Sequence, residues 1–479
     1  MKILFFIFLH FLFFSLDNCY IKIPLKFHPC QIFNISNPSN TFNNMVMQHL
    51  YAKLEIGSPK QTIYVPLEIE KNDFYITKYG KYSSNEKYTT FNLKNFKEDE
   101  SSSFYYTNEE QDSIYYNTNI LTASFAKDLF FFGDKKVELK FFLADIVNDL
   151  IPGELGLQIK PIDDLNSAFD NEEKTFLKKL KNSGIIKNYV WSILYNQDNN
   201  DKNADAYLYI GDYLHNIDFN DLTLKNTKFK VESLSSVNSF VYQRTVLKEF
   251  EMNKLYLYKG DNPNDIVKDI DFGKNYLRVK LDDNICGIQA SELIRPYLEE
   301  KIFTEENRCH KDYFNYMNKY IFYYCDKNPS IRDKIKKNFI SLNFVHQDFN
   351  HNFTINFDDI FVEKEDYYYF LIYFSDYHKY TWILGKPFLN KYNFMFDQDA
   401  KKILFYSEKE EIVLPGVQST TLIVLLIILI IIFLFLGFFF ARKIYKTKFK
   451  KHINILDDNF DYSIQAEKNE IEMSKKIYE

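Results

Sequence analysis

The chain has 479 residues, of which 46% are hydrophobic and 26% charged, so it is long and apolar enough to build a large folded core. Its formal net charge of −6 and its dispersed basic residues argue against nucleic acid as a partner. The 48 Phe and 37 Tyr are spread over the whole sequence among many Lys, Asn and Ile. This aromatic richness indicates a compositional bias and not a ligand site.

The N-terminus has the pattern of a secretory signal. Lys2 precedes a long apolar run that reaches Leu16, and polar residues follow it. We expect a signal peptide over residues 1–19 and an N-terminal extension over residues 20–46. Because no Ala-x-Ala pattern lies near Cys19, an uncleaved N-terminal membrane anchor is the alternative. Both interpretations place the middle of the chain outside the cytosol.

The middle of the chain is predicted to be mostly β. Short runs rich in β-branched and aromatic residues alternate with clusters of Asn, Asp, Gly and Ser. Strands are expected at residues 51–56, 62–67, 137–143, 191–195, 207–210 and 352–357. Only residues 172–182 and 291–302 show the apolar spacing of three and four residues that is typical of helices.

Two parts of this region share a short pattern. In the first, an apolar strand ends in Glu68 and a later element ends in Leu-Gly at Gly156. In the second, an apolar strand ends in Asp282 and a later element ends in Leu-Gly at Gly385. A repeat at half the length of the region suggests two related β lobes with a site between them.

Four of the five cysteines follow the predicted signal, in a region that is expected to be oxidising. Cys309 and Cys325 close a short loop and are the first choice for a disulfide. Spacing alone leaves pairings with Cys30 and Cys286 open. No histidine or cysteine spacing fits a zinc site, and there is no Gly-rich phosphate loop, so we expect no metal and no cofactor.

A membrane anchor is predicted near the C-terminus. Residues 421–441 are uncharged, and as a helix they would cross a hydrocarbon core of about 30 Å. We predict one transmembrane helix over residues 420–441. Basic residues from Arg442 onward are typical of the cytosolic side, so residues 442–479 are predicted to be a cytosolic tail. Residues 453–479 have mixed charge and little apolar periodicity, which predicts disorder. The protein is then a single-pass type I protein of the secretory pathway or cell surface.

Two blocks carry a resemblance to a known family. Residues 57–67 (GSPKQTIYVPL) resemble the strand pair that opens the pepsin-like aspartic proteases, and residues 382–397 (WILGKPFLNKYNFMFD) are similar to the C-terminal signature of that family. The resemblance implies a mostly β, bilobal, pepsin-like double β-barrel with few short helices. The N-terminal lobe would cover residues 47–215 and the C-terminal lobe residues 216–410.

The catalytic motifs of that family are altered here. After the first strand the family has Asp-Thr-Gly-Ser, and the matching positions hold Glu68, Ile69, Glu70 and Lys71. In the second half, Asp282, Asp283 and Asn284 match the second Asp-Thr-Gly, and a neighbouring acidic residue is the alternative to Asp282.

The family's flap hairpin also has a counterpart. Residues 114–119 resemble it, with Tyr116 at the position of the flap tyrosine. The resemblance therefore implies a dyad formed by Glu68 and Asp282, and a cleft lined by Tyr116, Ile69, Asp283 and Asn284.

These substitutions predict an impaired dyad. Catalysis needs two carboxylates that share one proton, and Glu68 brings its carboxylate on a side chain that is one methylene longer than aspartate. We therefore expect a membrane-anchored pseudoprotease that binds a peptide or protein partner in the interlobe cleft. The alternatives are an active aspartic-type endopeptidase with a Glu/Asp dyad and a non-enzymatic surface or secretory-organelle scaffold.

Overall fold

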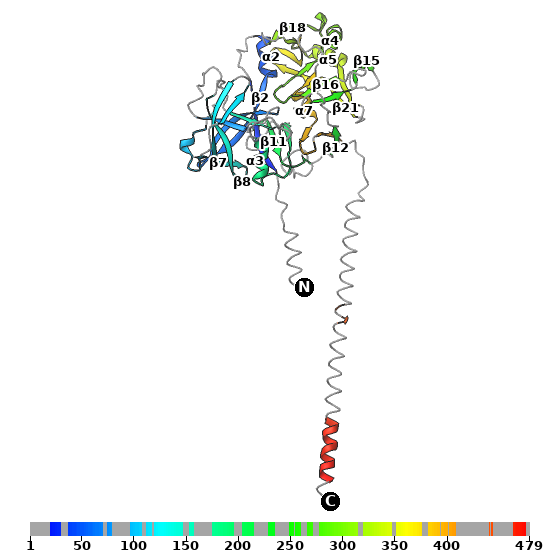
Figure 1. Cartoon of the computed structure of the whole chain (residues 1–479). Helices are drawn as coiled ribbons and strands as arrows, with labels where there is room; N and C mark the ends of the chain where they lie inside the picture. Colours follow the sequence, from blue (N-terminus) through cyan, green and yellow to red (C-terminus); the bar gives the residue numbers. More distant parts are fainter. Residues whose placement is uncertain are drawn as a thin grey trace. The chain divides into compact units, whose positions relative to one another are not determined.

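The computed structural model divides the chain into two compact units, Met1–Lys409 and Glu410–Glu479. The structure describes residues 20–29, 37–69, 74–78, 96–107, 112–116, 119–146, 153–157, 175–195, 204–214, 229–234, 249–252, 254–259, 266–271, 277–314, 320–346, 351–375, 382–392, 394–400, 402–408, 440, 442–443 and 463–475. In its first unit, strands far outnumber short helices, which confirms the mostly β prediction (Figure 1).

The largest sheet of the first unit contains fourteen of the described strands. In spatial order they are β12 (Phe229–Leu234), β26 (Lys402–Glu408), β25 (Phe394–Asp397), β10 (Val190–Tyr195), β11 (Ala206–Ile210), β1 (Ile21–Pro29), β2 (Gln48–Ile56), β3 (Gln61–Glu68), β9 (Gly153–Gly156), β4 (Phe74–Thr77), β8 (Lys135–Ile146), β7 (Asn119–Phe132) and β5 (Tyr105–Tyr106), with β6 (Asp112–Tyr116) paired to β7. This sheet joins strands from both ends of the unit.

Two further sheets contain only strands between Glu249 and Leu384, and we call this part of the chain the second half of the unit and the part before it the first half. One contains β13 (Glu249–Met252), β16 (Leu277–Leu281), β24 (Trp382–Leu384), β17 (Ile288–Ala290), β23 (Tyr367–Ser375), β19 (Tyr320–Asp326) and β18 (Cys309–Phe314), with β22 (Phe361–Lys364) paired to β23. The other contains β15 (Ile266–Asp271), β14 (Lys254–Lys259), β20 (Ile340–His346) and β21 (His351–Ile355). Fully buried rings such as Trp382 and Tyr373 fill the core of this half.

The predicted strands are present, with one corrected boundary. The strand expected at residues 352–357 ends at Ile355, because Asn356 caps a new helix, α6 (Phe357–Ile360), through a capping box with Asp359. The two predicted helices are shorter than expected, as α3 (Phe176–Asn182) and α4 (Arg295–Lys301).

Three more short helices were not predicted. They are α2 (Pro38–Val46), α5 (Pro329–Asn338) and α7 (Lys386–Lys391). All three have proline within their first two positions, where its missing N–H is not needed. Asn37 and Asn328 cap α2 and α5 with their side chains, so the start signals were present in the sequence.

The N-terminal extension is built into the fold. Strand β1 lies between β11 and β2, and its alternate residues Ile21, Ile23 and Leu25 are buried. Helix α2 then packs on the second half of the unit, where the ring of Phe42 is fully buried and stacks on Phe322 at a centroid distance of 4.2 Å. The extension therefore contacts both halves before β2 begins.

The second unit is described at only a few residues. The predicted transmembrane run lies outside the described residues except for Phe440, and within the described part we find no helix that is both long and apolar enough to cross a membrane. The prediction of disorder in the tail is wrong at residues 463–475, which form a helix with exposed side chains. Its Ala, Glu, Lys and Gln residues are good helix formers, which explains the helix without apolar periodicity.

Candidate active site

In the first half of the unit, Glu68 is the last residue of a strand that lies in a set of three paired strands. Strand β3 pairs in parallel with β9, with Leu67 opposite Leu155 and Glu68 opposite Gly156. Strand β9 then pairs in antiparallel fashion with β4, where Phe74 is also opposite Leu155. The backbone N–H of Leu157 donates to the carbonyl of Glu68 at 3.0 Å. The end of β3 is thus held by two neighbouring strand segments.

The second half repeats this arrangement around Asp282. Strand β16 pairs in parallel with β24, with Leu281 opposite Leu384, and β17 pairs in antiparallel fashion with β24, with Ile288 opposite Leu384. The N–H of Asp282 donates to the carbonyl of Leu384 at 3.1 Å. Leu281 and Ile288 therefore correspond to Leu67 and Phe74 of the first half.

Six residues lie between Leu67 and Phe74 and six lie between Leu281 and Ile288, and we call residues 68–73 the first loop and residues 282–287 the second loop. Glu68, the last residue of β3, begins the first loop, and Asp282, directly after β16, begins the second. The short sequence repeat around Gly156 and Gly385 is therefore a repeat of paired strands. Both acidic residues are half-buried, and they occupy matching positions in the two halves.

The loop that begins at Asp282 is well ordered by hydrogen bonds. The Asp282 carboxylate accepts a bond from the N–H of Asn284 at 3.0 Å. The side-chain oxygen of Asn284 in turn accepts a bond from the N–H of Leu50 at 3.3 Å. Asn284 thereby connects the loop of the second half to β2 of the first half.

The end of the N-terminal extension also holds this loop. The N–H of Cys286 donates to the carbonyl of Val46 at 2.8 Å, and Met47 forms an isolated β-bridge with Ile285. The thiol of Cys286 lies 3.3 Å from the side-chain oxygen of Gln48. Segment 46–50 is thus a strap over the second loop, which sequence reasoning did not foresee.

The residues after the two acids are buried but chemically unlike each other. Ile69 is 7% exposed and Asp283 is 1% exposed. Isoleucine has no hydrogen-bonding group, so a symmetric polar contact between the two positions is impossible. Asp283 thus brings a buried carboxyl group to the second loop, while its counterpart in the first half brings a hydrocarbon side chain.

Tyr195 is a second residue that sequence reasoning missed. It ends β10, its ring stacks on Phe27 of β1, and its buried hydroxyl makes no hydrogen bond within the described part of the chain. Burial raises the pKa of Tyr195 well above its ordinary value, and the negative charges of Asp283 and Asp282 raise it further. The phenol therefore stays neutral near the second loop, and no local sequence pattern indicates this position.

Glu154 places an additional acidic residue in the first half. It lies two residues before Gly156 on β9, so its side chain points to the same face of the sheet as that of Glu68. On that face it is opposite Tyr75 and is 1% exposed. The first half thus brings Glu68 and Glu154 to one face of the sheet, whereas a symmetric dyad takes a single acidic side chain from each half. The acid inside the Gly-Glu-Leu-Gly element was the available signal.

Some predicted site residues are described only in part. Glu70 and Lys71 lie outside the described residues. Tyr116 ends β6 opposite Asn119 of β7, so a hairpin is present at the predicted flap, but the described features there are those of the backbone. The predicted cleft contacts of Tyr116 therefore stay a prediction.

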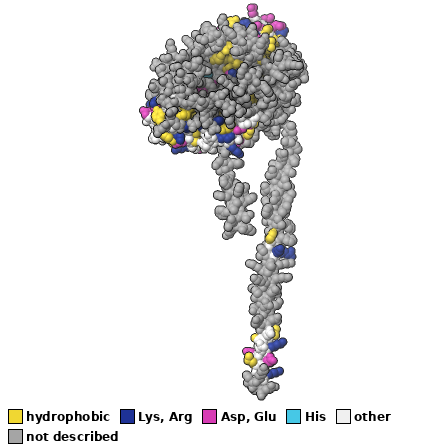
Figure 2. Space-filling view, in the orientation of Figure 1, with side chains coloured by type: hydrophobic (Ala, Val, Ile, Leu, Met, Phe, Trp, Pro, Cys, Tyr) yellow, Lys and Arg dark blue, Asp and Glu magenta, His cyan; other side chains and the backbone are white. Residues whose placement is uncertain are grey.

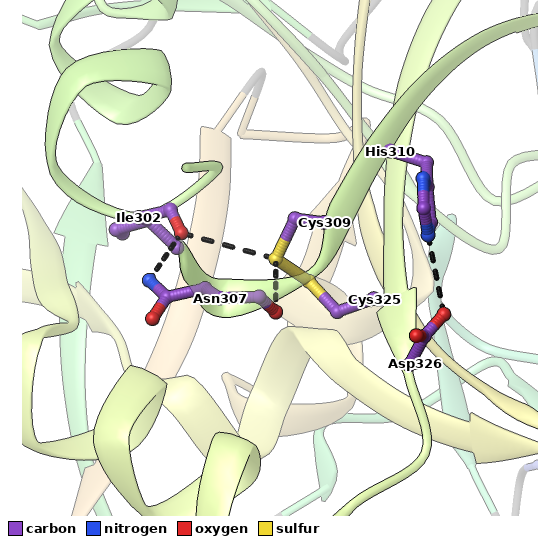
Figure 3. The surroundings of a disulfide bond; sticks show 6 residues. All are labelled: Ile302, Asn307, Cys309, His310, Cys325 and Asp326. Atoms are coloured by element: carbon purple, nitrogen blue, oxygen red, sulfur yellow. Dashed lines mark hydrogen bonds and ion pairs between the residues drawn. A yellow bond between two sulfur atoms is a disulfide. The ribbon is translucent and has the colours of Figure 1, made fainter. Parts of the chain in front are cut away.

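The predicted disulfide between Cys309 and Cys325 is present. These residues are directly opposite each other on β18 and β19. Figure 3 shows the bond beside Asn307, whose amide donates to the carbonyl of Ile302 at 2.7 Å, and beside His310, which lies 3.1 Å from Asp326. Cys286 is buried and is not in a disulfide.

Comparison with known families gives a match over most of the unit. Residues 49–407 match the family of eukaryotic aspartyl proteases. No match was found among curated proteins. The matched residues include Glu68 and Asp282 and end within β26, whereas strand β1 and helix α2 precede them.

Proposed function

This chain belongs to the eukaryotic aspartyl protease family, and on that premise we propose that it is a pseudoprotease, which binds an extended peptide or a protein segment between its two halves without cutting it. The observation that carries the proposal is the contrast between the two matching loops. Their strand framework is the same, while the side chains that follow the two acids differ in size and polarity.

The retained framework supports binding. A cleft between two β halves positions an extended ligand through backbone contacts, and these contacts do not depend on the catalytic carboxylates. The loop after Asp282 is held by Asn284, Val46 and Gln48. Because this loop is already ordered, ligand binding does not require a further loss of its conformational entropy.

The altered chemistry argues against efficient cleavage. A dyad needs two facing carboxylates about 3 Å apart that share one proton. The extra methylene of Glu68 moves its carboxylate by more than about 1 Å, and a misplacement of that size reduces rates by about a hundredfold. Ile69 removes a hydrogen bond that would hold the dyad in place, and Glu154 adds a second acidic side chain on the same face of the sheet as Glu68.

A second candidate is an active endopeptidase that uses Glu68 and Asp282. The matching loop positions and half-burial of these two residues favour it. Such an enzyme would show a bell-shaped dependence of rate on pH and would bind transition-state mimics with a central hydroxyl group.

We further propose that the chain is a type I membrane protein with its first unit on the lumenal or outer side. The apolar run at residues 421–441, the basic residues after it and the disulfide between Cys309 and Cys325 support this topology. Protection of the first unit from added protease in sealed microsomes would test it, since exposure of this unit on the cytosolic side would overturn the proposal.

The decisive experiment uses the full chain in detergent micelles with a mixed peptide library at pH 3 to 8. We expect saturable binding of some peptides and no new peptide termini by mass spectrometry. Asp282→Asn should alter peptide affinity, whereas Asp358→Asn, at an exposed acid of the second half, should not.

If peptides are cleaved, and cleavage is lost in Asp282→Asn but kept in Asp358→Asn, the protein is an active endopeptidase and not a pseudoprotease. If no peptide is bound and none is cleaved, the cleft has no ligand function, and a scaffold that acts through other surfaces is the better description.

A further inference from the structure

A hollow of about 450 Å³ lies in the first half of the large sheet, away from the two acidic loops. It is bordered by the start of β1, the end of β2, the turn between β7 and β8, and Tyr207 of β11. Its volume is in the range of small-molecule sites. Figure 2 shows basic and hydrophobic side chains next to each other along the lower edge of the globular part, near β7 and β8 of Figure 1.

The hollow exists because two neighbouring strands separate. The ladder between β1 and β2 extends from Pro29 opposite Gln48 only as far as Leu25 opposite Ala52. The next residue of β1 is Pro24, which has no N–H to donate, so the ladder ends there. Beyond that point β2 pairs with β7 instead, with Glu55 opposite Phe131.

Positive charge predominates on the walls of the hollow. Lys22, Lys53 and Lys135 line it, against the two acids Glu55 and Asp134. The Glu55 carboxylate already pairs with Lys60, which is outside the lining, at 3.2 Å. Asp134 is exposed at the tip of the turn. The acids therefore leave the charges of Lys22 and Lys53 largely uncompensated.

Lys22 and Lys53 have few competing contacts, whereas Lys135 is already engaged. The side chain of Lys53 is half-buried, and within the described residues it forms no ion pair or hydrogen bond, although its backbone pairs with that of Tyr64. Lys22 has its ammonium group 3.9 Å from the ring centroid of Tyr207, a contact that fixes its position without neutralising its charge. Lys135 donates to the backbone carbonyl of Tyr20 at 2.9 Å. Two ammonium groups are thus available to an anion.

We propose that this hollow binds an organic phosphate, with the phosphate between Lys22 and Lys53 and a short apolar part against Pro24 and Phe131. Lysine ammonium groups bind phosphate oxygens as point charges with several donors each. The half-buried position of Lys53 limits screening by salt, which makes the contact stronger than one on an open surface. The site does not depend on whether the cleft binds or cuts peptides.

The phosphate could be carried by a lipid or by a soluble metabolite, and the test separates the two. The full chain in zwitterionic detergent is titrated with inorganic phosphate, with glycerol 3-phosphate and with dihexanoyl phosphatidic acid, and binding is followed by calorimetry. Vesicles of phosphatidylcholine with or without phosphatidic acid form the last arm. Tighter binding of dihexanoyl phosphatidic acid than of glycerol 3-phosphate, with binding to vesicles only when they contain phosphatidic acid, identifies a lipid. Equal binding of these two organic phosphates identifies a soluble metabolite, and equally tight binding of inorganic phosphate would contradict a contribution from the apolar part.

The variants make the proposal falsifiable. Lys53→Gln and Lys22→Gln should each weaken binding by about tenfold, the effect of one lost charged hydrogen bond. Lys127→Gln, on β7 and outside the lining, is the matched control and should bind as the wild type does. No saturable binding by any probe, or equal weakening in the control, would overturn the site. Unchanged thermal unfolding of the unliganded variants excludes misfolding as the cause.

Discussion

Removal of the disulfide between Cys309 and Cys325 should lower the stability of the first unit by a calculable amount. The two cysteines are 16 residues apart and face each other across the β18–β19 hairpin. For a loop of this length, the lost constraint on the unfolded chain corresponds to about 3 kcal/mol. In a unit with close to 400 residues, that difference lowers the unfolding temperature by about 4 °C, because the unfolding entropy grows with size.

The assay is thermal unfolding of the full chain, followed by circular dichroism, for the wild type and for the double variant Cys309→Ser, Cys325→Ser. Reductant should shift the wild type to the temperature of the double variant and should leave that variant unchanged. Cys286→Ser is the control, because it removes a buried thiol and should keep the shift with reductant. A wild type that unfolds at the same temperature with and without reductant would refute the reasoning.

Three further predictions concern packing, pH and chemistry. Phe42→Ala should cost about 3–5 kcal/mol by denaturant unfolding, because this fully buried ring anchors α2 on Phe314 and Phe322, and a loss below about 1 kcal/mol would contradict that anchoring. Tyr213 donates to Asp397, which raises its pKa from 10.0 to about 12, so this stabilisation is complete below pH 10 and is lost as the pH rises toward 12. The unfolding free energy of the wild type should therefore fall relative to that of Tyr213→Phe over this pH range, and parallel curves would disprove the linkage. Restoring Asp-Thr-Gly-Ser at residues 68–71 should produce peptide cleavage at least about a hundredfold above the wild-type background, and added Asp282→Asn should abolish it. A restored motif without any cleavage would show that the framework itself is impaired.

The sequence predicted the framework well where a local pattern and a paired partner agree. The blocks that end at Leu67 and Leu384 were predicted as apolar elements followed by an acid or a glycine, and both are buried strands in the structure. The pairing of Cys309 with Cys325 was also predicted, because a short loop brings both residues to facing positions of one hairpin.

Other features could not be read from local patterns. Glu154 becomes a neighbour of Glu68 only through the register of two strands that are far apart in sequence. Tyr195 is likewise close to Asp283 and Asp282 although it is far from them in sequence. Helices α2 and α5 are stabilised by caps and by packing, and their residues have little overall hydrophobicity. The spacing of apolar residues therefore did not predict them.

Strand β1 has a practical consequence for anyone who expresses this protein. The family match begins at residue 49, and a recombinant version that started there would omit a strand with neighbours on both sides. Strands β2 and β11 would then each present a bare edge, and exposed edges of this kind recruit other chains and cause aggregation. The smallest soluble fragment should therefore begin at or before Tyr20, well ahead of the point where the family resemblance starts.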